Sequence, residues 1–180
     1  MIDVDRLLIE KYNVRKRLVE MEDAKFITNL RADTELCQFI HFGDGSLKNQ
    51  IEWLRKYKER EKQEKEYYFI FESLDGKTYG TERFYDFDDH SFVGGSWLFT
   101  RDSPAGLPVL CELAARKFAF EISRFVYNRL DVRKGNKKVL NYHRKVWKVQ
   151  TIAEDELNFY FILNKNQFYK RFDVVLEMCL

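Results

Sequence analysis

The sequence predicts one α+β domain, built on a twisted, mostly antiparallel sheet of about seven strands with about four helices around it. Segments that alternate with a period of two are interspersed with segments of helical period along the whole chain. No repeat, low-complexity tract or Gly/Ser linker interrupts this order. The 180 residues, 45% of them hydrophobic, suffice for one well-buried core and are few for two, so residues 1–180 are expected to form a single domain.

The chain is predicted to begin with a strand that is followed by two helices. Residues 13–20 alternate apolar and polar side chains, which favours a strand. Glu22 and Asp23 then supply acidic residues suited to the first turn of a helix that runs to about Leu30. Ser46 is a suitable N-cap for the second helix. The buried stripe of that helix is predicted to consist of Leu47, Ile51, Leu54 and Tyr57.

Three strands and a central helix follow. The strands are predicted at residues 66–72, 77–87 and 91–101, and their short connections are typical of an antiparallel meander. The most apolar helix of the chain is predicted from Gly106 to about Ser123. Because its apolar residues lie on more than one side, this helix is expected to pack against the sheet in the centre of the domain.

The last part of the chain returns to short elements. A strand is predicted at residues 126–132, a helix at 136–147, and two strands at 149–153 and 157–163. Residues 164–180 fit either a helix or a strand.

The helix at residues 136–147 carries one histidine in the middle of its apolar face. At helical spacing, the residues on that face are Val139, Tyr142, His143, Val146 and Trp147. A histidine in such a place is either a core residue that is hydrogen-bonded to a backbone carbonyl or a chemically active group.

Composition narrows the class of protein. The 31 basic and 29 acidic side chains nearly cancel, so no strong field points to nucleic acid or to an anionic membrane. Cys37, Cys111 and Cys179 are odd in number and widely spaced, which is typical of reduced, buried thiols in a cytoplasmic protein. The N-terminus lacks the pattern of a secretion signal, and no stretch approaches the roughly 18 apolar residues of a membrane span. The three histidines cluster neither with one another nor with cysteine, so no metal site is expected.

The order of elements, together with the residues that open the helix at 136, resembles the GNAT superfamily of N-acetyltransferases. Members of that family often have an asparagine at the start of the last helix, a small apolar residue three positions on and a tyrosine seven positions on. Asn136, Val139 and His143 occupy these places here, while Trp147 and Lys148 stand where a Gly-Phe pair is common. The resemblance implies a GNAT-like fold and an enzyme that uses acetyl-CoA and no metal.

The resemblance also implies where acetyl-CoA binds. In the family, a loop of the form Gln/Arg-x-x-Gly-x-Gly/Ala at the start of the central helix offers its amides to the pyrophosphate. The matching segment, 101–106, keeps the arginine and the last glycine but has Pro104 at the first glycine. The alternative is a plain strand-to-helix turn, in which Pro108 occupies an early helical position. The residues expected to contact the coenzyme are Leu98, Phe99, Thr100, Arg101, Ala105, Gly106, Leu107 and Asn136.

His143 stands where the family has a tyrosine that protonates the departing coenzyme A thiolate. Unperturbed histidine titrates near pH 6.5, so His143 can donate an N–H to the thiolate or accept a proton from the attacking amine. Tyr142 is the alternative acid. Because a helix turns by about 100° per residue, only one of the two can face the sulfur.

A base or substrate clamp is expected from the third strand. Alternation places Glu82, Phe84 and Asp86 on one face of it and Arg83 and Tyr85 on the other. Glu82 is the first choice, as a carboxylate that can orient or deprotonate an ammonium group. The alternative is an ordinary solvated strand carboxylate.

The main hypothesis is an acetyl-CoA-dependent N-acetyltransferase in which a neutral primary amine attacks the thioester and strand amides hold the oxyanion. Segment 135–143 looks similar to bacterial enzymes that acetylate nucleotide-linked amino sugars for surface polysaccharides. That small molecule is the first acceptor considered, and a protein N-terminus, as in the ribosomal-protein branch, is the second. A third hypothesis is a binding module without catalysis that recognises RNA or a partner through basic residues of the last helix. A homodimer is left open.

Overall fold

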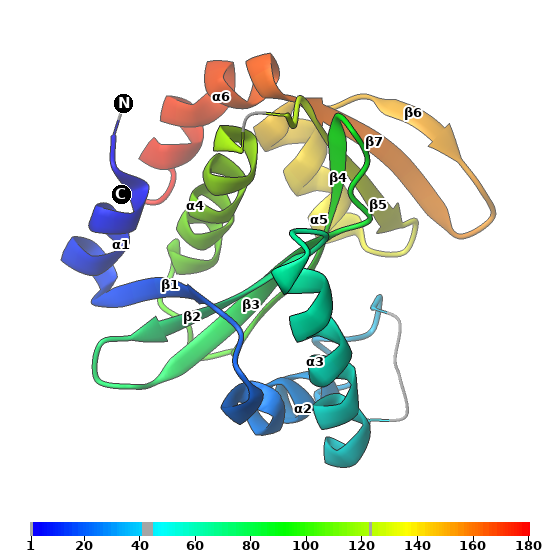
Figure 1. The fold of residues 1–180 in the computed structure, drawn as a ribbon. Coiled ribbons are helices and arrows are strands. Elements are labelled where there is room, and N and C mark those ends of the chain that lie inside the picture. The colour runs from blue at the N-terminus through cyan, green and yellow to red at the C-terminus, as the bar shows by residue number, and fades with distance from the viewer. Residues whose placement is uncertain (1, 41–44, 123) are drawn as a thin grey trace.

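The computed structural model describes residues 2–40, 45–122 and 124–180. Within them, seven strands form one sheet in the order β1-β2-β3-β4-β5-β7-β6 (Figure 1). Neighbouring strands are antiparallel except for β4 and β5, which run parallel. The strands are β1 (Val14–Leu18), β2 (Tyr67–Ser73), β3 (Thr78–Tyr85), β4 (Ser91–Phe99), β5 (Tyr127–Arg133), β6 (Thr151–Glu154) and β7 (Asn158–Asn164).

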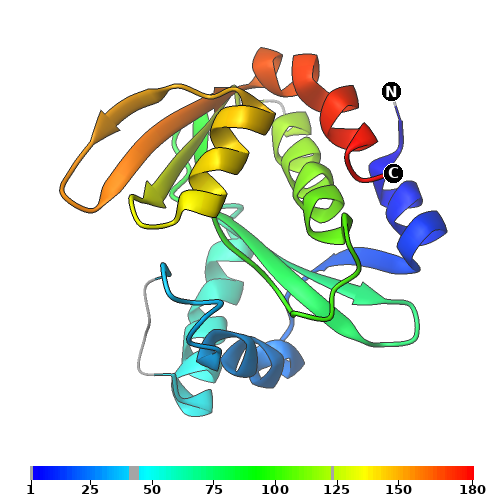
Figure 2. The same ribbon diagram turned by 180° about the vertical axis from the view of Figure 1, so that it is seen from behind.

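Helices cover both faces of the sheet (Figures 1 and 2). The α-helices are α1 (Val4–Tyr12), α2 (Ala24–Ala32), α3 (Leu47–Lys62), α4 (Leu107–Glu121), α5 (Lys137–Tyr142) and α6 (Lys165–Glu177). A 3-10 turn, η1 (Met21–Asp23), precedes α2, and a π-helix, η2 (His143–Trp147), continues α5. One face of the sheet packs against α4, with α1, α5 and α6 beside it, whereas α2 and α3 pack together on the other face.

Two of these helices were not assigned from the sequence. α1 begins where Asp3 Oδ1 accepts a hydrogen bond from the N–H of Arg6 (3.1 Å), and it ends at Asn13, whose φ of 55° is left-handed. α6 occupies the segment that fitted either helix or strand, and Asn164 caps it. Its buried side chains recur at helical spacing: Phe168, Phe172, Val175 and Leu176. The described residues therefore form six α-helices rather than about four.

The main core lies between α4 and the sheet. Leu110 and Ala114 of α4 are buried there, as predicted for the most apolar helix of the chain. Aromatic rings of the sheet face them, and the rings of Phe84 and Phe92 lie 4.8 Å apart in an edge-to-face arrangement. The predicted end of this helix, near Ser123, lies outside the described residues.

α3 confirms its predicted cap and corrects its predicted stripe. Ser46 Oγ accepts a hydrogen bond from the N–H of Asn49 at 3.2 Å. Leu54 and Tyr57 are fully buried, as expected. The prediction was wrong for Leu47, which is 43% exposed because it is the first residue of the helix and lies at its outer end.

β4 and β5 are joined over only a short length. Their pairing extends from Ser91 to Val93 on β4 and from Tyr127 to Arg129 on β5, although both strands continue well past these residues. Beyond the paired positions the two strands are no longer hydrogen-bonded to each other, which leaves a wedge in the sheet. Since unpaired strand edges carry free N–H and C=O groups, the wedge can pair with an extended ligand.

β4 has a bulge next to the wedge. The register between β3 and β4 shifts between Thr81 and Arg83, and Ser96 has a left-handed φ of 52°. The Thr81 hydroxyl donates a hydrogen bond to the Ser96 carbonyl at 2.8 Å, which holds this conformation in place. Because a non-glycine residue held at such a φ costs about 1–3 kcal/mol, backbone strain is concentrated beside the wedge.

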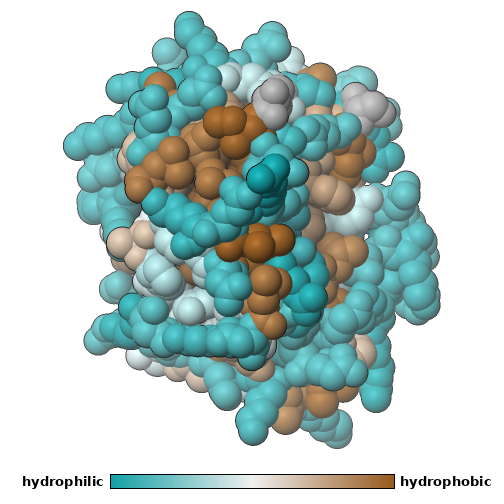
Figure 3. Space-filling view, turned by 90° about the vertical axis from the view of Figure 1, so that its left-hand side faces the viewer, coloured by the Kyte–Doolittle hydropathy of each residue, from teal (hydrophilic) through white to brown (hydrophobic). Residues whose placement is uncertain are grey.

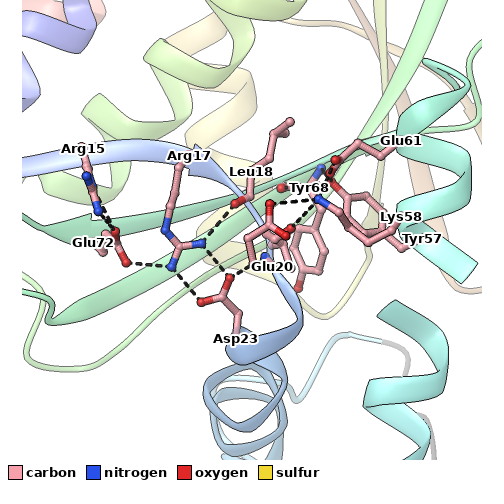
Figure 4. Close-up of polar contacts among 11 residues, drawn as sticks. Arg15, Arg17, Leu18, Glu20, Asp23, Tyr57, Lys58, Glu61, Tyr68 and Glu72 are labelled. Carbon is pink, nitrogen blue, oxygen red and sulfur yellow. Dashed lines mark hydrogen bonds and ion pairs between the residues drawn. The ribbon is translucent and has the colours of Figure 1, made fainter. Parts of the chain in front are cut away.

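Ion pairs connect β1 to β2 and to the start of α2 (Figure 4). The Arg17 guanidinium contacts Asp23 at 2.7 Å and Glu72 at 2.7 Å. Arg15 contacts the same Glu72 at 2.7 Å from a more exposed position. Arg17 therefore neutralises two nearly buried carboxylates, whereas Arg15 only adds a second partner to one of them.

Arg17→Met is expected to lower the free energy of unfolding by about 2–3 kcal/mol, because it leaves both carboxylates without their shared cation. The matched change Arg15→Met is expected to cost less than about 1 kcal/mol, since the Arg15 side chain is 55% exposed against 28% for Arg17. Urea unfolding of the two variants at pH 7 measures both values. Equal losses of stability in the two variants would contradict the conclusion that Arg17 is the cation that neutralises the buried carboxylates.

The side of the molecule that carries α1 and the two chain ends is shown in Figure 3, where hydrophobic surface is divided into patches by hydrophilic residues. Exposed apolar side chains include Ile9 of α1 and Val174 of α6. Lys11 of α1 donates a hydrogen bond to the carbonyl of Leu180, and the two chain ends lie side by side (Figures 1 and 2). None of the described helices combines the length and the apolar character needed to cross a lipid bilayer.

Candidate active site

The turn before α4 presents backbone N–H groups at the carboxyl end of β4. Gly106 is the N-cap of α4 and has a φ of 82°. Among the described residues, the N–H groups of Ala105, Gly106 and Val109 have no hydrogen-bond partner in the protein, whereas the N–H of Leu107 donates to the Pro104 carbonyl at 3.1 Å. Two of the three amides predicted to bind phosphate are thus free, and Val109 adds another. Free amides and the helix dipole together favour an anion here.

Residues from both ends of the chain close the outer side of this turn. The Tyr12 hydroxyl lies 2.8 Å from the Ala105 carbonyl and 3.0 Å from the Cys179 carbonyl. A Cβ atom at Gly106 would lie 2.6 Å from the Tyr12 hydroxyl and 3.1 Å from the Cys179 carbonyl oxygen. Position 106 therefore requires glycine both for its φ and for its packing.

Arg101, which was predicted to contact the coenzyme, forms ion pairs with the segment that follows α2. Its guanidinium lies 2.8 Å from Asp33 and 2.8 Å from Glu35. The hydrogen bond from Arg101 lowers the pKa of Asp33 to about 2. Since exposed ion pairs of this kind contribute little net stability, a phosphate group can compete for the guanidinium.

The end of β4 can meet a ligand only through its backbone. The side chains of Leu98 and Phe99 are buried in clusters on opposite faces of the sheet. The N–H of Thr100 donates to the Tyr79 carbonyl of β3 at 2.8 Å. Because N–H directions alternate along a strand, the N–H of Phe99 points to the opposite edge, toward the wedge.

Asn136 caps α5. Its Oδ1 accepts a hydrogen bond from the N–H of Val139 at 3.2 Å. The predicted contact of Asn136 with the coenzyme stays a prediction, and the observed role of its side chain is to start the helix that leads to His143.

His143 begins the π-helix and is only 5% exposed. Its ring lies between those of Tyr142 and Phe161, at centroid distances of 5.3 and 6.4 Å. Burial, and next the charge of Arg116, lower the pKa of His143 to about 3. Among the described residues, its Nδ1 has no hydrogen-bond partner. The imidazole is therefore neutral near pH 7 and can donate or accept a hydrogen bond. Its low pKa also makes it a weak base.

Tyr142 is only partly buried, and its hydroxyl is held by neighbouring side chains. Its hydroxyl donates a hydrogen bond to Glu112 Oε2 and accepts one from Trp147 Nε1 at 3.2 Å. Burial first, and then the Glu112 carboxylate, raise the pKa of Tyr142 well above its usual value. Because this proton is held by Glu112, His143 is the better candidate of the two for the thiolate.

Glu112 and Arg116 of α4 are the central charges of this network, and the sequence analysis missed them. Glu112 is 1% exposed and Arg116 is 2% exposed, and the distance between Arg116 Nη2 and Glu112 Oε1 is 2.7 Å. Glu112 accepts hydrogen bonds from Tyr142 of α5 and, at 3.3 Å, from Trp147 of η2, and thus connects α4 to the helix that carries His143. The available signal was two charges four positions apart on a helix without any polar face.

Glu82 lies in the core rather than at an open cleft. The predicted alternation of β3 is correct, but the face that carries Glu82 and Phe84 is the one that α4 covers. Glu82 is 2% exposed, and its Oε2 has no hydrogen-bond partner within the described residues. Burial first, and then the charge of Glu112, raise the pKa of Glu82 well above its usual value. The base role of Glu82 stays a prediction.

Glu82→Gln is expected to stabilise the fold increasingly as pH rises. In the unfolded chain the Glu82 carboxyl loses its proton near pH 4.5, whereas in the folded protein it keeps the proton to higher pH. The contribution of Glu82 to the free energy of unfolding is therefore present below pH 4.5 and is lost as pH rises above it. Glutamine carries no proton to lose. Urea unfolding at pH 5 and pH 8 should show a larger gain at pH 8.

Glu72→Gln is the matched control for that prediction. Its hydrogen bond with Arg17 is the first of the causes that lower the pKa of Glu72, so the stability from this group is present at neutral pH and lost as pH falls below 4.5. The control should therefore be destabilised at pH 8. A gain for Glu82→Gln that does not change with pH would contradict the assignment, and unchanged turnover in that variant would exclude the base role.

The face of the wedge toward α2 is more polar. Leu130 and Val132 of β5 are buried on the α4 side, so alternation places Asp131 and Arg133 on the other side. The Tyr85 ring lies over β4 here, because a Cβ atom at Gly95 would be 3.1 Å from it. Burial first, and then the charge of Asp131, raise the pKa of Tyr85. Asp131 is thus an exposed carboxylate on the side of the wedge away from α4.

A cleft of about 510 Å³ lies on the same side, at the carboxyl end of β5. It is lined by residues 38–40 after α2, residues 133–135 at the end of β5, and residues 156–157 in the turn between β6 and β7. The sequence analysis did not single out any of these residues, because three separate loops form the cleft only after folding.

No group of histidine, cysteine, aspartate and glutamate side chains in the described part of the chain is arranged to hold a metal ion. His41, one of the three histidines considered above, lies outside the described residues.

Comparison with known proteins identifies relatives by structure. No family model matches the sequence, and no curated protein matches it. The fold is similar to that of FdhC, a nucleotide-linked sugar GNAT, with a TM-score of 0.82 and 35% identity over 93% of this chain and 95% of that one. It is also similar to ribosomal-protein-S5-alanine acetyltransferase from Vibrio fischeri, with a TM-score of 0.72 and 15% identity over 86% of this chain and 95% of that one. A third similar structure is spermidine N-acetyltransferase from Vibrio cholerae in complex with CoA and spermine, with a TM-score of 0.70 and 14% identity over 87% of this chain and 98% of that one.

The chain therefore belongs to the GNAT superfamily of N-acetyltransferases. This confirms the predicted fold class and the resemblance seen in the sequence. Acetyl-CoA is the acetyl donor of this family, and the residues present fit it: the N–H groups of Ala105, Gly106 and Val109 have no partner among the described residues, and the wedge offers an unpaired strand edge.

Proposed function

We propose that this protein transfers the acetyl group of acetyl-CoA to the primary amine of a nucleotide-linked amino sugar used in surface polysaccharide synthesis. The likeness to a nucleotide-linked sugar GNAT at 35% identity over nearly the whole chain carries the choice of acceptor. The structures at 14% and 15% identity share the fold alone and favour no other acceptor. The wedge between β4 and β5 supports the acetyl-transfer chemistry, because Trp97 of β4 contacts both the first turn of α4, at the Pro108 carbonyl, and Tyr142, the residue before His143.

The protein contributes binding and hydrogen bonds on the side of the donor. Acetyl-CoA, when bound, supplies an activated thioester. The amides of Ala105, Gly106 and Val109 would hold its pyrophosphate at the start of α4. The N–H of Phe99 would pair with the arm that lies in the wedge. The neutral imidazole of His143 would donate a hydrogen bond to the sulfur as it departs.

The acceptor amine must be neutral to attack, and it would reach the wedge from the side of α2. Asp131 is the exposed carboxylate on that side and takes the role first considered for Glu82. Its carboxylate would orient the amine and, with solvent, take up the proton that is released.

Two measurements test this proposal. Thermal unfolding with acetyl-CoA at 100 times its Kd should show a gain of about 2.7 kcal/mol in stability. Release of free thiol should then follow with nucleotide-linked amino sugars and not with short peptides that present a free N-terminus. Turnover of the peptides instead would favour a protein N-terminal acetyltransferase. The absence of any stabilisation by acetyl-CoA would favour a binding module that uses the basic residues of α5, η2 and the position after η2, namely Lys137, Lys138, Arg144, Lys145 and Lys148.

The proposal places the enzyme in the cytoplasm. Its three cysteines are buried free thiols, which suits a reducing compartment. The chemistry does not depend on oligomeric state, and a homodimer stays a prediction that light scattering can check.

A further inference from the structure

We propose that the cleft binds the nucleoside diphosphate of the acceptor, with the Arg133 guanidinium on the diphosphate and the Phe39 ring against the base. This inference rests on the proposed function and deepens it, because it assigns to named residues the part of the acceptor that does not react.

Arg133 is a cation of the cleft without a carboxylate partner in the described part of the chain. Two neighbouring cations are already neutralised: Arg129, on the same face of β5, lies 3.0 Å from Asp86, and Lys134 lies 3.2 Å from Glu154. Among the described residues, the Arg133 guanidinium pairs with no carboxylate. Because the planar guanidinium matches phosphate oxygens through two parallel hydrogen bonds, an unpaired arginine in a cleft suits a diphosphate better than it suits a neutral sugar.

Phe39 gives the cleft an aromatic wall. A Cβ atom at Gly135 would lie 2.8 Å from Phe39 Cε1, so the ring packs directly against the backbone at the end of β5. This contact fixes the ring within the same cleft as Arg133. A fixed aromatic ring next to a free cation is the combination that binds a base by stacking and its phosphates by charge.

The cleft is also placed correctly relative to the wedge. Arg133 and Asp131 are two positions apart on one face of β5, which separates them by about 7 Å along the strand. A diphosphate at Arg133 therefore directs the attached sugar toward Asp131 and the wedge. Glu156, an exposed carboxylate in the turn between β6 and β7, also lines the cleft and opposes an anion. Arg133 should therefore raise the affinity for the diphosphate, and Glu156 should lower it.

Calorimetry with dTDP and with UDP tests the assignment, with CoA at saturation so that the coenzyme site is filled. Arg133→Met should raise the Kd of the better of the two nucleotides about 10- to 100-fold. Arg133→Lys should raise the Kd by a smaller factor, because lysine keeps the positive charge but lacks the two parallel N–H donors of the guanidinium. Glu156→Gln should lower the Kd, because it removes a negative charge from the cleft. Lys170→Met removes a cation from an exposed position on α6 and should change nothing. In turnover assays, Arg133→Met should raise KM for the nucleotide-linked amino sugar and leave KM for the free amino sugar unchanged.

The outcomes separate this inference from the function on which it rests. If the wild-type protein acetylates nucleotide-linked amino sugars while Arg133→Met and Glu156→Gln leave Kd and KM unchanged, the assignment of the cleft is overturned and the proposed function stands. If the wild-type protein turns over none of these acceptors, the proposed function fails. The assignment then stands if the calorimetric changes appear as expected, and it falls if neither dTDP nor UDP binds.

Discussion

His143→Ala is expected to lower kcat by roughly 10²- to 10⁴-fold while leaving the Kd of acetyl-CoA within about threefold of the wild-type value. The reason is that we propose His143 as the donor to the departing sulfur, whereas the turn before α4 and the wedge, which we propose as the coenzyme site, contain no part of its ring. Stopped-flow measurement of a single turnover gives the effect on the chemical step, and a separate binding measurement gives the effect on the Kd of acetyl-CoA.

The dependence on pH distinguishes a chemical role from a packing role. Because burial lowers the pKa of His143 to about 3, the residue stays neutral from pH 5 to pH 8 and should add no inflection to the rate profile in that range. Replacement by tyrosine, the residue that the family has at this place, should restore part of kcat. His143→Gln, which keeps an N–H donor, should retain more activity than His143→Ala.

Stability supplies the control for the His143 variants. Histidine in the unfolded chain takes up a proton below pH 6.5, whereas the folded one resists until about pH 3, so wild-type stability falls as pH drops through this window, by up to about 5 kcal/mol. His143→Gln should lose that acid sensitivity. If kcat and stability fall together, and tyrosine rescues neither, His143 is a core residue and not the group that meets the sulfur.

Gly106→Ala is expected to weaken acetyl-CoA binding by about 100- to 1000-fold and to lower the free energy of unfolding by about 2–4 kcal/mol. The added methyl group would lie 2.6 Å from the Tyr12 hydroxyl and 3.1 Å from the Cys179 carbonyl oxygen, so the turn and its free amides must shift. Calorimetry with acetyl-CoA and urea unfolding measure the two effects.

Gly76→Ala is the matched control for Gly106→Ala. Gly76 also has a positive φ, of 93°, but a Cβ atom there would meet nothing within 4 Å. This control should therefore cost only the backbone strain, about 1 kcal/mol, and leave coenzyme binding unchanged. Wild-type affinity in Gly106→Ala would exclude the turn before α4 as the phosphate site.

Periodicity predicted most of the fold because burial on one face enforces it. The strands from β1 to β7 and the helices α2 to α5 lie where alternating or helical patterns placed them. α1 was missed because it has only nine residues and a strand pattern follows it directly. The segment of α6 was ambiguous because its aromatic residues fit both periods, and only its packing beside α4 decides between them.

The candidate site was less accessible to sequence reasoning, for reasons that differ from residue to residue. The spacing of Asn136 and His143 located the right helix. An apolar stripe does not distinguish an α-helix from the π-helix η2, in which each N–H bonds to the carbonyl five residues before it rather than four. Alternation put Glu82 on the correct face of β3 without revealing that α4 fills that face. Arg133 and Phe39 are far apart in sequence, and only the folded chain brings them to one cleft.

The short contact between β4 and β5 has a mechanical consequence. These strands are paired at three positions, whereas β5 and β7 are paired at seven. The sheet is therefore two stiff plates joined near one corner by a small hinge. A rotation about that hinge changes the width of the opening through which donor and acceptor meet, and it breaks no hydrogen bond inside either plate. Because the main core packs against both parts of the sheet, only a small rotation leaves that core intact.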